Sequence, residues 1–125
     1  KCNLQKGDKV LLEVEMELIP GDYDEIKSKM EHFLECRRQK QPLNLPSAGS
    51  TFKRPPGNYA GYLIEKAGLK GYKIGGAMVS DMHAGFIVNV DKATFKDVVN
   101  LMEYIQKQVM LKFNVDLEPE IKIIS

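Results

Sequence analysis

The first residues of this chain that suggest chemistry lie in the stretch LNLPSAGSTFKRPPGN, where Ser50 stands between Gly49 and Thr51. A loop serine commonly acts as a turn residue whose hydroxyl satisfies nearby backbone donors. As a nucleophile, Ser50 lacks the G-x-S-x-G frame, and His83 is its only plausible base. As an acid, a hydroxyl can protonate only a very basic centre, such as a carbanion or an enolate, and only when it is held in place.

Cations lie at both ends of the same segment. Lys53 and Arg54 follow the serine directly, and Arg38 and Lys40 come shortly before the loop. Such residues are usually solvated surface charges. They would also suit a clamp for a phosphate or diphosphate, because a guanidinium fork matches phosphate oxygens.

Two further polar residues border apolar runs. His83 precedes the apolar stretch AGFIVNV, and Glu120 begins the mostly apolar end of LEPEIKII. Their ordinary interpretations are a polar residue at a strand end and a solvated edge glutamate. A functional interpretation is also open for both, because a strand end would hold a catalytic or binding side chain rigidly.

Hydrophobic periodicity predicts the elements that must position these groups. Residues 10–18 alternate apolar and polar side chains, which predicts a half-buried strand. Residues 23–39 follow with an apolar stripe at helical spacing, and Asp22 or Asp24 can cap this helix. No period is visible from Pro42 to about Asn58, but the prolines of this segment favour an ordered loop.

The second half of the chain alternates short elements before a long helix. Gly68 suits a left-handed helix end, Gly75-Gly76 a turn or a close backbone approach, and Thr94 with Asp97 a capping box. The expected elements are a short helix over 59–68, an interrupted strand over 72–80, a strand over 83–90, a long helix over 91–114 and a last strand over 115–125. The order predicts an α+β fold in a single domain, with a small mixed sheet, about three helices and one long ordered polar loop.

Composition narrows the class of protein. Apolar residues make up 43% of the chain and charged residues 28%, with a formal net charge of +1. This balance argues against a nucleic-acid partner and against intrinsic disorder. No run approaches the roughly 18 apolar residues of a membrane span. Cys2 and Cys36 lack metal-site spacing, so we expect no metal, reduced thiols and a cytoplasmic protein.

Three blocks of sequence together resemble one enzyme family. RRQKQPLNLPSAGSTFKRP, YAGYLIEKAGLKGYKIGGAMVSDMHAGFIVN and LEPEIKII occur in the order typical of the C-terminal substrate-binding domain of UDP-N-acetylenolpyruvoylglucosamine reductase. The resemblance runs from about Val10 to Ile124 and is closest to the shorter type of this family, which lacks a tyrosine-bearing insertion.

The resemblance implies an oxidoreductase of peptidoglycan precursor synthesis. FAD, reduced by NADPH, would deliver hydride to the enolpyruvyl double bond of UDP-N-acetylglucosamine enolpyruvate and so give UDP-N-acetylmuramate. Ser50 matches the serine that protonates the enolate, and Glu120 matches the glutamate that stabilises it. Lys40, Arg54 and His83 match positions that meet the substrate, and Lys53 belongs to the same cationic group.

The resemblance also implies a division of labour between domains. The flavin and a catalytic arginine would belong to domains that precede this chain, so most cofactor-binding residues stay unknown and this part alone would be inactive. We expect residues 1–20 to be a tail strand continuous with the flavin-binding domain and residues 21–125 to be the C-terminal domain. The expected partners are the substrate and the N-terminal flavin-binding domains, with no nucleic acid and no membrane. A stand-alone module that binds nucleotide sugars without chemistry of its own is the alternative.

Overall fold

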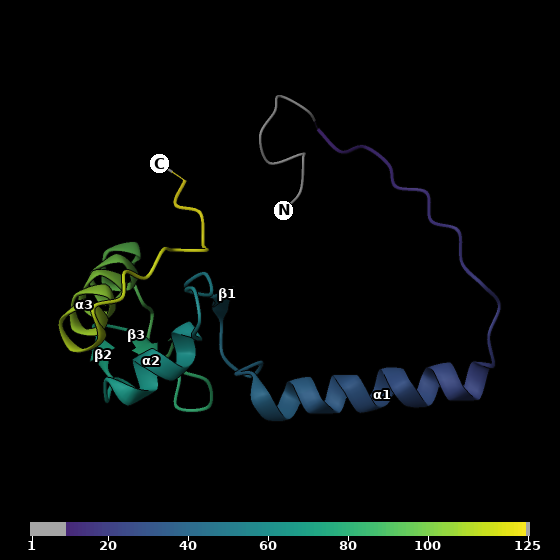
Figure 1. The fold of residues 1–125 in the computed structure, drawn as a ribbon, viewed down its shortest axis with the longest axis horizontal. Coiled ribbons are helices and arrows are strands. Elements are labelled where there is room, and N and C mark those ends of the chain that lie inside the picture. The colour runs from purple at the N-terminus through teal and green to yellow at the C-terminus, as the bar shows by residue number, and fades with distance from the viewer. Residues whose placement is uncertain (1–9, 125) are drawn as a thin grey trace. The chain divides into compact units, whose positions relative to one another are not determined.

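A computed structural model describes residues 10–124 of the chain, which divide into two units between His32 and Phe33 (Figure 1). Residues 10–22 contain no strand, and their side chains are exposed. The expected strand over residues 10–18 is therefore wrong for the described residues. A strand requires a neighbour that accepts its hydrogen bonds, and none of the described strands pairs with this segment.

The first helix confirms the prediction made from its apolar period. Helix α1 spans Tyr23–Lys40, and the side chain of Asp22 accepts a hydrogen bond from the N–H of Glu25 at 2.9 Å. Its apolar side chains Ile26 and Met30 are exposed. Cys36 is a half-buried thiol of this helix, whereas Cys2 lies outside the described residues.

A four-stranded antiparallel sheet forms the centre of the second unit. Its strands stand in the order β1-β4-β3-β2, and each neighbouring pair is antiparallel. The strands are β1 (Ser47–Ser50), β2 (Lys73–Ile74), β3 (Ala77–Val79) and β4 (Phe86–Asn89). Gly75 and Gly76 make the turn between β2 and β3, and a Cβ atom at Gly76 would lie only 2.0 Å from the Asp91 carbonyl oxygen.

Strand β1 corrects the prediction that residues 42–58 hold only a loop. Ser47 pairs with Val88 and Ser50 with Phe86, and the register shifts between these two pairs. Gly49, at φ +87°, takes the left-handed conformation that such an irregularity uses. Four small or polar residues have no alternating pattern of their own, so this strand depends on its partner β4 rather than on its own side chains.

Two helices cover the core side of this sheet. Helix α2 (Ala60–Lys66) ends in a Schellman motif, because Leu69 N–H donates to Ile64 O at 3.2 Å and Gly68 N–H donates to Glu65 O at 2.9 Å. Helix α3 (Phe95–Phe113) contacts α2, β2 and β3. The core comprises Phe52, residues of α2 and the sheet, and the α3 stripe of Leu101, Met102, Ile105 and Val109.

The ends of α3 confirm their sequence signals. The Thr94 hydroxyl accepts from Asp97 N–H at 3.2 Å, and the Asp97 carboxylate accepts from Thr94 N–H at 2.9 Å. Hydrogen bonds to the Asp97 carboxylate, first from the N–H of Thr94, then from the Thr94 hydroxyl and the N–H of Gly76, hold the pKa of Asp97 below its usual value. Asn114 ends the helix in the left-handed conformation. Phe113, the last residue of the helix, is exposed.

The C-terminal segment is not the strand that its sequence suggested. Residues 115–124 make only an isolated bridge between Pro119 and Phe52. Proline has no N–H to donate, so the pairing cannot propagate as a regular ladder. Two backbone bonds flank the bridge: Lys53 N–H to Glu118 O at 2.8 Å, and Glu120 N–H to Thr51 O at 2.9 Å.

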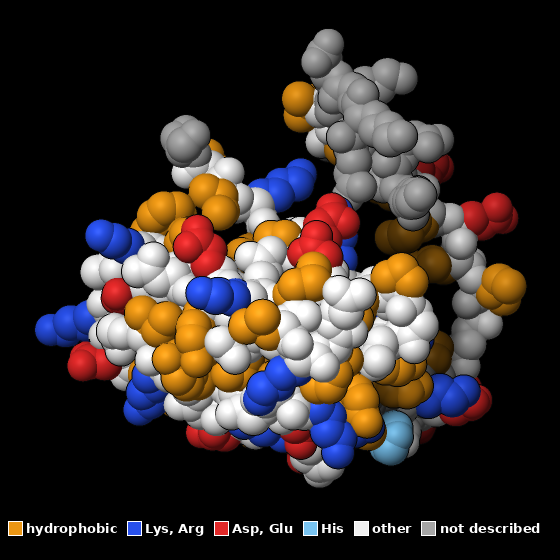
Figure 2. All heavy atoms as spheres, turned by 60° about the vertical axis from the view of Figure 1, so that its left-hand side comes forward, with side chains coloured by type: hydrophobic (Ala, Val, Ile, Leu, Met, Phe, Trp, Pro, Cys, Tyr) orange, Lys and Arg blue, Asp and Glu red, His pale blue; other side chains and the backbone are white. Residues whose placement is uncertain are grey.

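The predicted α+β class is confirmed, with three helices and a small sheet in the described residues, but the sheet is antiparallel throughout rather than mixed. On the face drawn in Figure 2, the charges of both signs are interspersed rather than gathered by sign. Within the described part of the chain, no helix is both long and apolar enough to cross a lipid bilayer.

Candidate functional site

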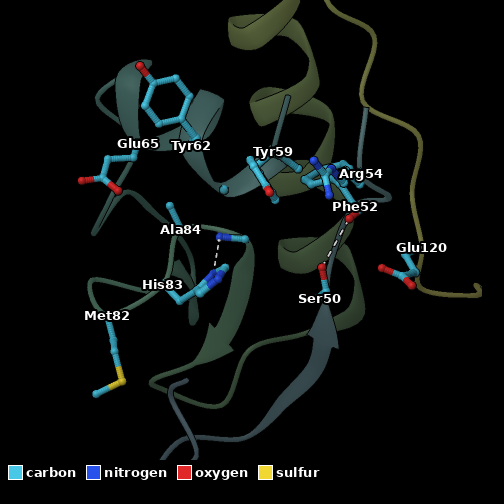
Figure 3. A pocket seen from close by; sticks show the side chains of 13 residues that line it. Ser50, Phe52, Arg54, Tyr59, Tyr62, Glu65, Met82, His83, Ala84 and Glu120 are labelled. Atoms are coloured by element: carbon cyan, nitrogen blue, oxygen red, sulfur yellow. Dashed lines mark hydrogen bonds between the residues drawn. The ribbon is translucent and has the colours of Figure 1, made fainter. Parts of the chain in front are cut away.

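The candidate site is a hollow of about 430 Å³ in the second unit. Four of the six residues singled out from the sequence line it together: Ser50, Arg54, His83 and Glu120. Each comes from a different part of the fold: the end of β1, the segment after it, the β3–β4 loop and the C-terminal segment (Figure 3).

Thr51 explains why these segments meet. Its N–H donates to Gly85 O and its carbonyl accepts from Glu120 N–H, both at 2.9 Å. Its buried hydroxyl accepts from Ile87 N–H at 3.1 Å. One residue therefore ties the loop before the site to β4 on one side and to the C-terminal segment on the other. Its neighbour Ser50 is held at the edge of the hollow as a result.

The Ser50 side chain is exposed to the hollow and only loosely engaged. Its hydroxyl donates to the carbonyl of Phe52 at 3.3 Å, which is long for a hydroxyl donor (Figure 3). Such a bond can be exchanged for one to a ligand at small cost. The described contacts of the His83 imidazole are with Gly85 and Phe86, so the two side chains do not form the serine–histidine pair of a hydrolase.

Arg54 is positioned by its neighbours rather than left mobile. Its guanidinium carbon lies 3.9 Å from the centre of the Tyr59 ring, and its Nε donates to Asn58 O at 3.3 Å. Cation–π stacking and one backbone bond fix the plane of the fork. The terminal nitrogens are then available to bind an anion in the hollow.

The other two predicted binding residues do not line this hollow. Lys53 makes an ion pair with Glu118, and Lys40 is the exposed last residue of α1. A ligand role for either lysine stays a prediction.

Sequence reasoning missed several residues of the lining. Tyr59, Tyr62 and Met82 are exposed at the hollow, and Glu65 also lines it. In the view of Figure 3, Tyr62, Glu65 and Met82 lie toward the side opposite Ser50 and Glu120. Two tyrosines three positions apart at the start of a helix share a face, and this spacing was the signal in NYAGYLIE that could have found them.

Comparison with known proteins identifies a family to which this chain is similar. Residues 41–124 match the sequence profile of a family described as UDP-N-acetylenolpyruvoylglucosamine reductase, C-terminal domain. The chain is 61% identical over 122 residues to a UDP-N-acetylenolpyruvoylglucosamine reductase of Caldanaerobacter subterraneus subsp. tengcongensis, covering 98% of this chain and 40% of that protein. A reductase of the same name from Limosilactobacillus reuteri is 55% identical over 123 residues, which cover 98% of this chain and 41% of that one.

A solved structure is similar as well. The crystal structure of UDP-N-acetylenolpyruvylglucosamine reductase from Thermus caldophilus superimposes with a TM-score of 0.60 and 39% identity, over 78% of this chain and 34% of that one. The chain thus spans about 40% of the length of the curated relatives described above.

Proposed function

Because this chain belongs to the family of the UDP-N-acetylenolpyruvoylglucosamine reductase C-terminal domain, we propose that it is the substrate-binding part of a flavoenzyme. The whole enzyme would reduce UDP-N-acetylglucosamine enolpyruvate to UDP-N-acetylmuramate with NADPH and act in the cytoplasm. The observation that carries this proposal is the shared hollow: Ser50, Glu120, Arg54 and His83 line it together.

The described residues do not fit a flavin. Arg54 is the only Lys or Arg lining the hollow, and a second groove of about 600 Å³ is lined mainly by apolar side chains of β4, α3 and the C-terminal segment. At the start of α3, the N–H groups of Thr94 and Asp97 are already engaged by the capping box. We therefore place the flavin, which would supply hydride, on residues outside this chain. The exposed apolar side chains of residues 10–18 support a tail that continues into such a domain.

Ser50 has the chemistry that the proposed reaction requires of this chain. Addition of hydride to the terminal carbon of the double bond moves an electron pair toward the carboxylate and leaves an enolate. The Ser50 hydroxyl then gives its proton to the carbon beside the carboxylate, and solvent returns a proton to the serine oxygen. An enolate is basic enough for a hydroxyl to protonate it, and the weak bond to the Phe52 carbonyl leaves that hydroxyl available.

Glu120, which lines the same hollow as Ser50, would stabilise the enolate. Its side chain would act near the enolate oxygen, where negative charge develops. The Glu120 backbone bond to Thr51 places this side chain on the segment adjacent to Ser50. Arg54 would bind the diphosphate, and His83 would hold an oxygen of the substrate.

The experiment that tests this function uses the full-length protein. We expect NADPH oxidation that depends on the enolpyruvate substrate and yields UDP-N-acetylmuramate, detected by mass spectrometry. Titration of UDP-N-acetylglucosamine into the 125-residue chain distinguishes this function from that of a stand-alone binding module. A stand-alone module should bind the nucleotide sugar tightly, whereas the substrate-binding part of a reductase should bind it weakly. Reduction of flavin by NADPH without any consumption of the substrate would sink the proposal.

A further inference from the structure

The Ser80 hydroxyl binds two backbone N–H groups inside the loop between β3 and β4. Ser80 is 2% exposed, and its side-chain oxygen accepts hydrogen bonds from Met82 N–H and His83 N–H, both at 3.2 Å. A buried serine that satisfies two successive backbone donors fixes the path of a tight turn. The Ser80 hydroxyl therefore holds the N–H of His83, while the His83 carbonyl accepts a backbone bond from Phe86 N–H at 3.0 Å.

The His83 imidazole is fixed at its ring as well. Its Nδ1 accepts a hydrogen bond from Gly85 N–H at 3.0 Å, and the ring meets Phe86 edge-on with ring centres 5.0 Å apart. A ring nitrogen that accepts carries no proton, so the neutral ring has its proton on Nε2. The side chain is exposed and lines the hollow (Figure 3), which makes Nε2–H a donor available to a ligand.

Two glycines leave room for this ring. A Cβ atom at Gly85 would lie 2.9 Å from Cε1 of His83, and one at Gly61 would lie 3.2 Å from the same atom. Gly61 lies within α2, where glycine costs about 1 kcal/mol relative to alanine. Glycine at this position therefore lets α2 lie close to both the His83 ring and the Gly85 backbone, at a cost in helix propensity.

We infer that Ser80 is a positioning residue, which fixes His83 as a neutral Nε2–H donor to an oxygen atom of the ligand in the hollow. The inference deepens the proposed function and rests on it for the identity of that ligand, a nucleotide sugar. Ser80 itself does not line the hollow, so it acts only through His83.

The first test measures the tautomer of the His83 imidazole by NMR. The chain contains two histidines, so ¹⁵N-histidine labelling gives a simple spectrum that His32→Gln assigns. We expect the two-bond ¹H–¹⁵N pattern of an Nε2–H tautomer for His83 and a mixture of tautomers in Ser80→Ala. A predominant Nδ1–H tautomer in the unmodified chain, or an unchanged pattern in Ser80→Ala, would overturn the inference.

The second test is a binding cycle with UDP-N-acetylglucosamine as the probe. We expect Ser80→Ala and His83→Ala each to weaken binding about tenfold, the loss of one hydrogen bond to the ligand. The double variant should lose no more than either single one, because Ser80 acts through His83. Losses that multiply in the double variant would contradict the positioning role.

A second variant covers the case in which Ser80→Ala does not fold. Gly61→Ala adds a Cβ atom 3.2 Å from both His83 Cε1 and Gly85 N, keeps the Ser80 hydroxyl and favours the helix. We expect a folded chain with shifted His83 resonances and weaker binding, and unchanged resonances with full binding would count against the inference. If the full-length protein does not bind the probe while the tautomer results hold, the nucleotide-sugar assignment fails and the positioning of His83 by Ser80 stands.

Discussion

Glu120 donates its backbone N–H to the carbonyl of Thr51 at 2.9 Å, and this bond brings the last acidic residue of the chain beside the loop that carries Ser50. The bridge between Phe52 and Pro119 continues the same contact by one residue in each segment. The buried Phe52 side chain anchors the pairing in the core. The candidate site therefore depends on a short pairing between segments far apart in the sequence.

Substitutions of Thr51 should show how much its buried hydroxyl contributes to the stability of the fold. Thr51→Val removes the acceptor of the buried Ile87 N–H and should lower the free energy of unfolding by about 1–3 kcal/mol. Thr51→Ser keeps that acceptor and loses one methyl group, about 1 kcal/mol. Urea unfolding measures both, and amide exchange at Ile87 should accelerate only in the valine variant. Equal exchange rates would show that the hydroxyl does not hold β4.

The sequence predicted the elements whose signals are local. The Thr94 and Asp97 capping box, the turn at Gly75-Gly76 and the glycine end of α2 each depend on neighbouring residues, and each is found where expected. Strand β1 was missed because a strand of four small or polar residues is defined by its partner. Alternation over residues 10–18 predicted a strand for which the described residues supply no neighbour.

The site residues, like β1, had no local signal in the sequence that connects them. Ser50 and Glu120 were chosen through resemblance, since no spacing in the chain connects them. The structure brings them to one hollow through long-range backbone pairing that has no pattern in the sequence. Lys53, chosen because it adjoins Arg54, instead pairs with Glu118, because adjacent side chains of an extended segment point to opposite sides.

Ser50→Ala should separate the two halves of the proposed reaction in the full-length protein. Reduction of flavin by NADPH should keep its rate, because Ser50 takes no part in it. Reoxidation by the enolpyruvate substrate should slow about 10²–10⁴-fold, the usual effect of losing a positioned proton donor. Stopped-flow absorbance follows both steps. Ser47→Ala, on the same strand but away from the hollow, is the matched control, and equal slowing of both steps in Ser50→Ala would exclude the proton-donor role.

Gly76→Ala should destabilise the fold because the new Cβ atom would clash with neighbouring backbone atoms, not because φ is positive at this position. Its Cβ atom would lie 2.0 Å from Asp91 O and 2.5 Å from Ala93 N, and backbone atoms cannot easily move away. We expect a loss of about 3 kcal/mol or more in the free energy of unfolding. Gly49→Ala supplies the contrast, because φ is +87° there but no atom lies within 4 Å of the new Cβ, so about 1–2 kcal/mol is expected. The reverse order in chemical denaturation would contradict this account.

Asp97 should contribute stability that depends on pH. Its pKa is lowered in the folded chain by the hydrogen bonds of the capping box, so the folded state favours the ionised form. The contribution is present above the unfolded pKa, near 3.8, and is lost as the pH falls through the lower folded pKa. The stability difference between the natural chain and Asp97→Asn should therefore shrink below about pH 4. Asp116→Asn, an exposed aspartate outside the helices, controls for the loss of one charge.

Arg54→Lys should weaken ligand binding more than removal of the neighbouring charge at Lys53. Lysine cannot reproduce the planar fork that Tyr59 and Asn58 orient, so UDP-N-acetylglucosamine should bind about tenfold more weakly. Lys53→Gln breaks an exposed ion pair with Glu118 and should change binding less than about twofold, because exposed pairs contribute little. Isothermal titration compares the two variants at one ionic strength. Comparable losses in both would indicate that net positive charge, rather than the oriented guanidinium, attracts the diphosphate.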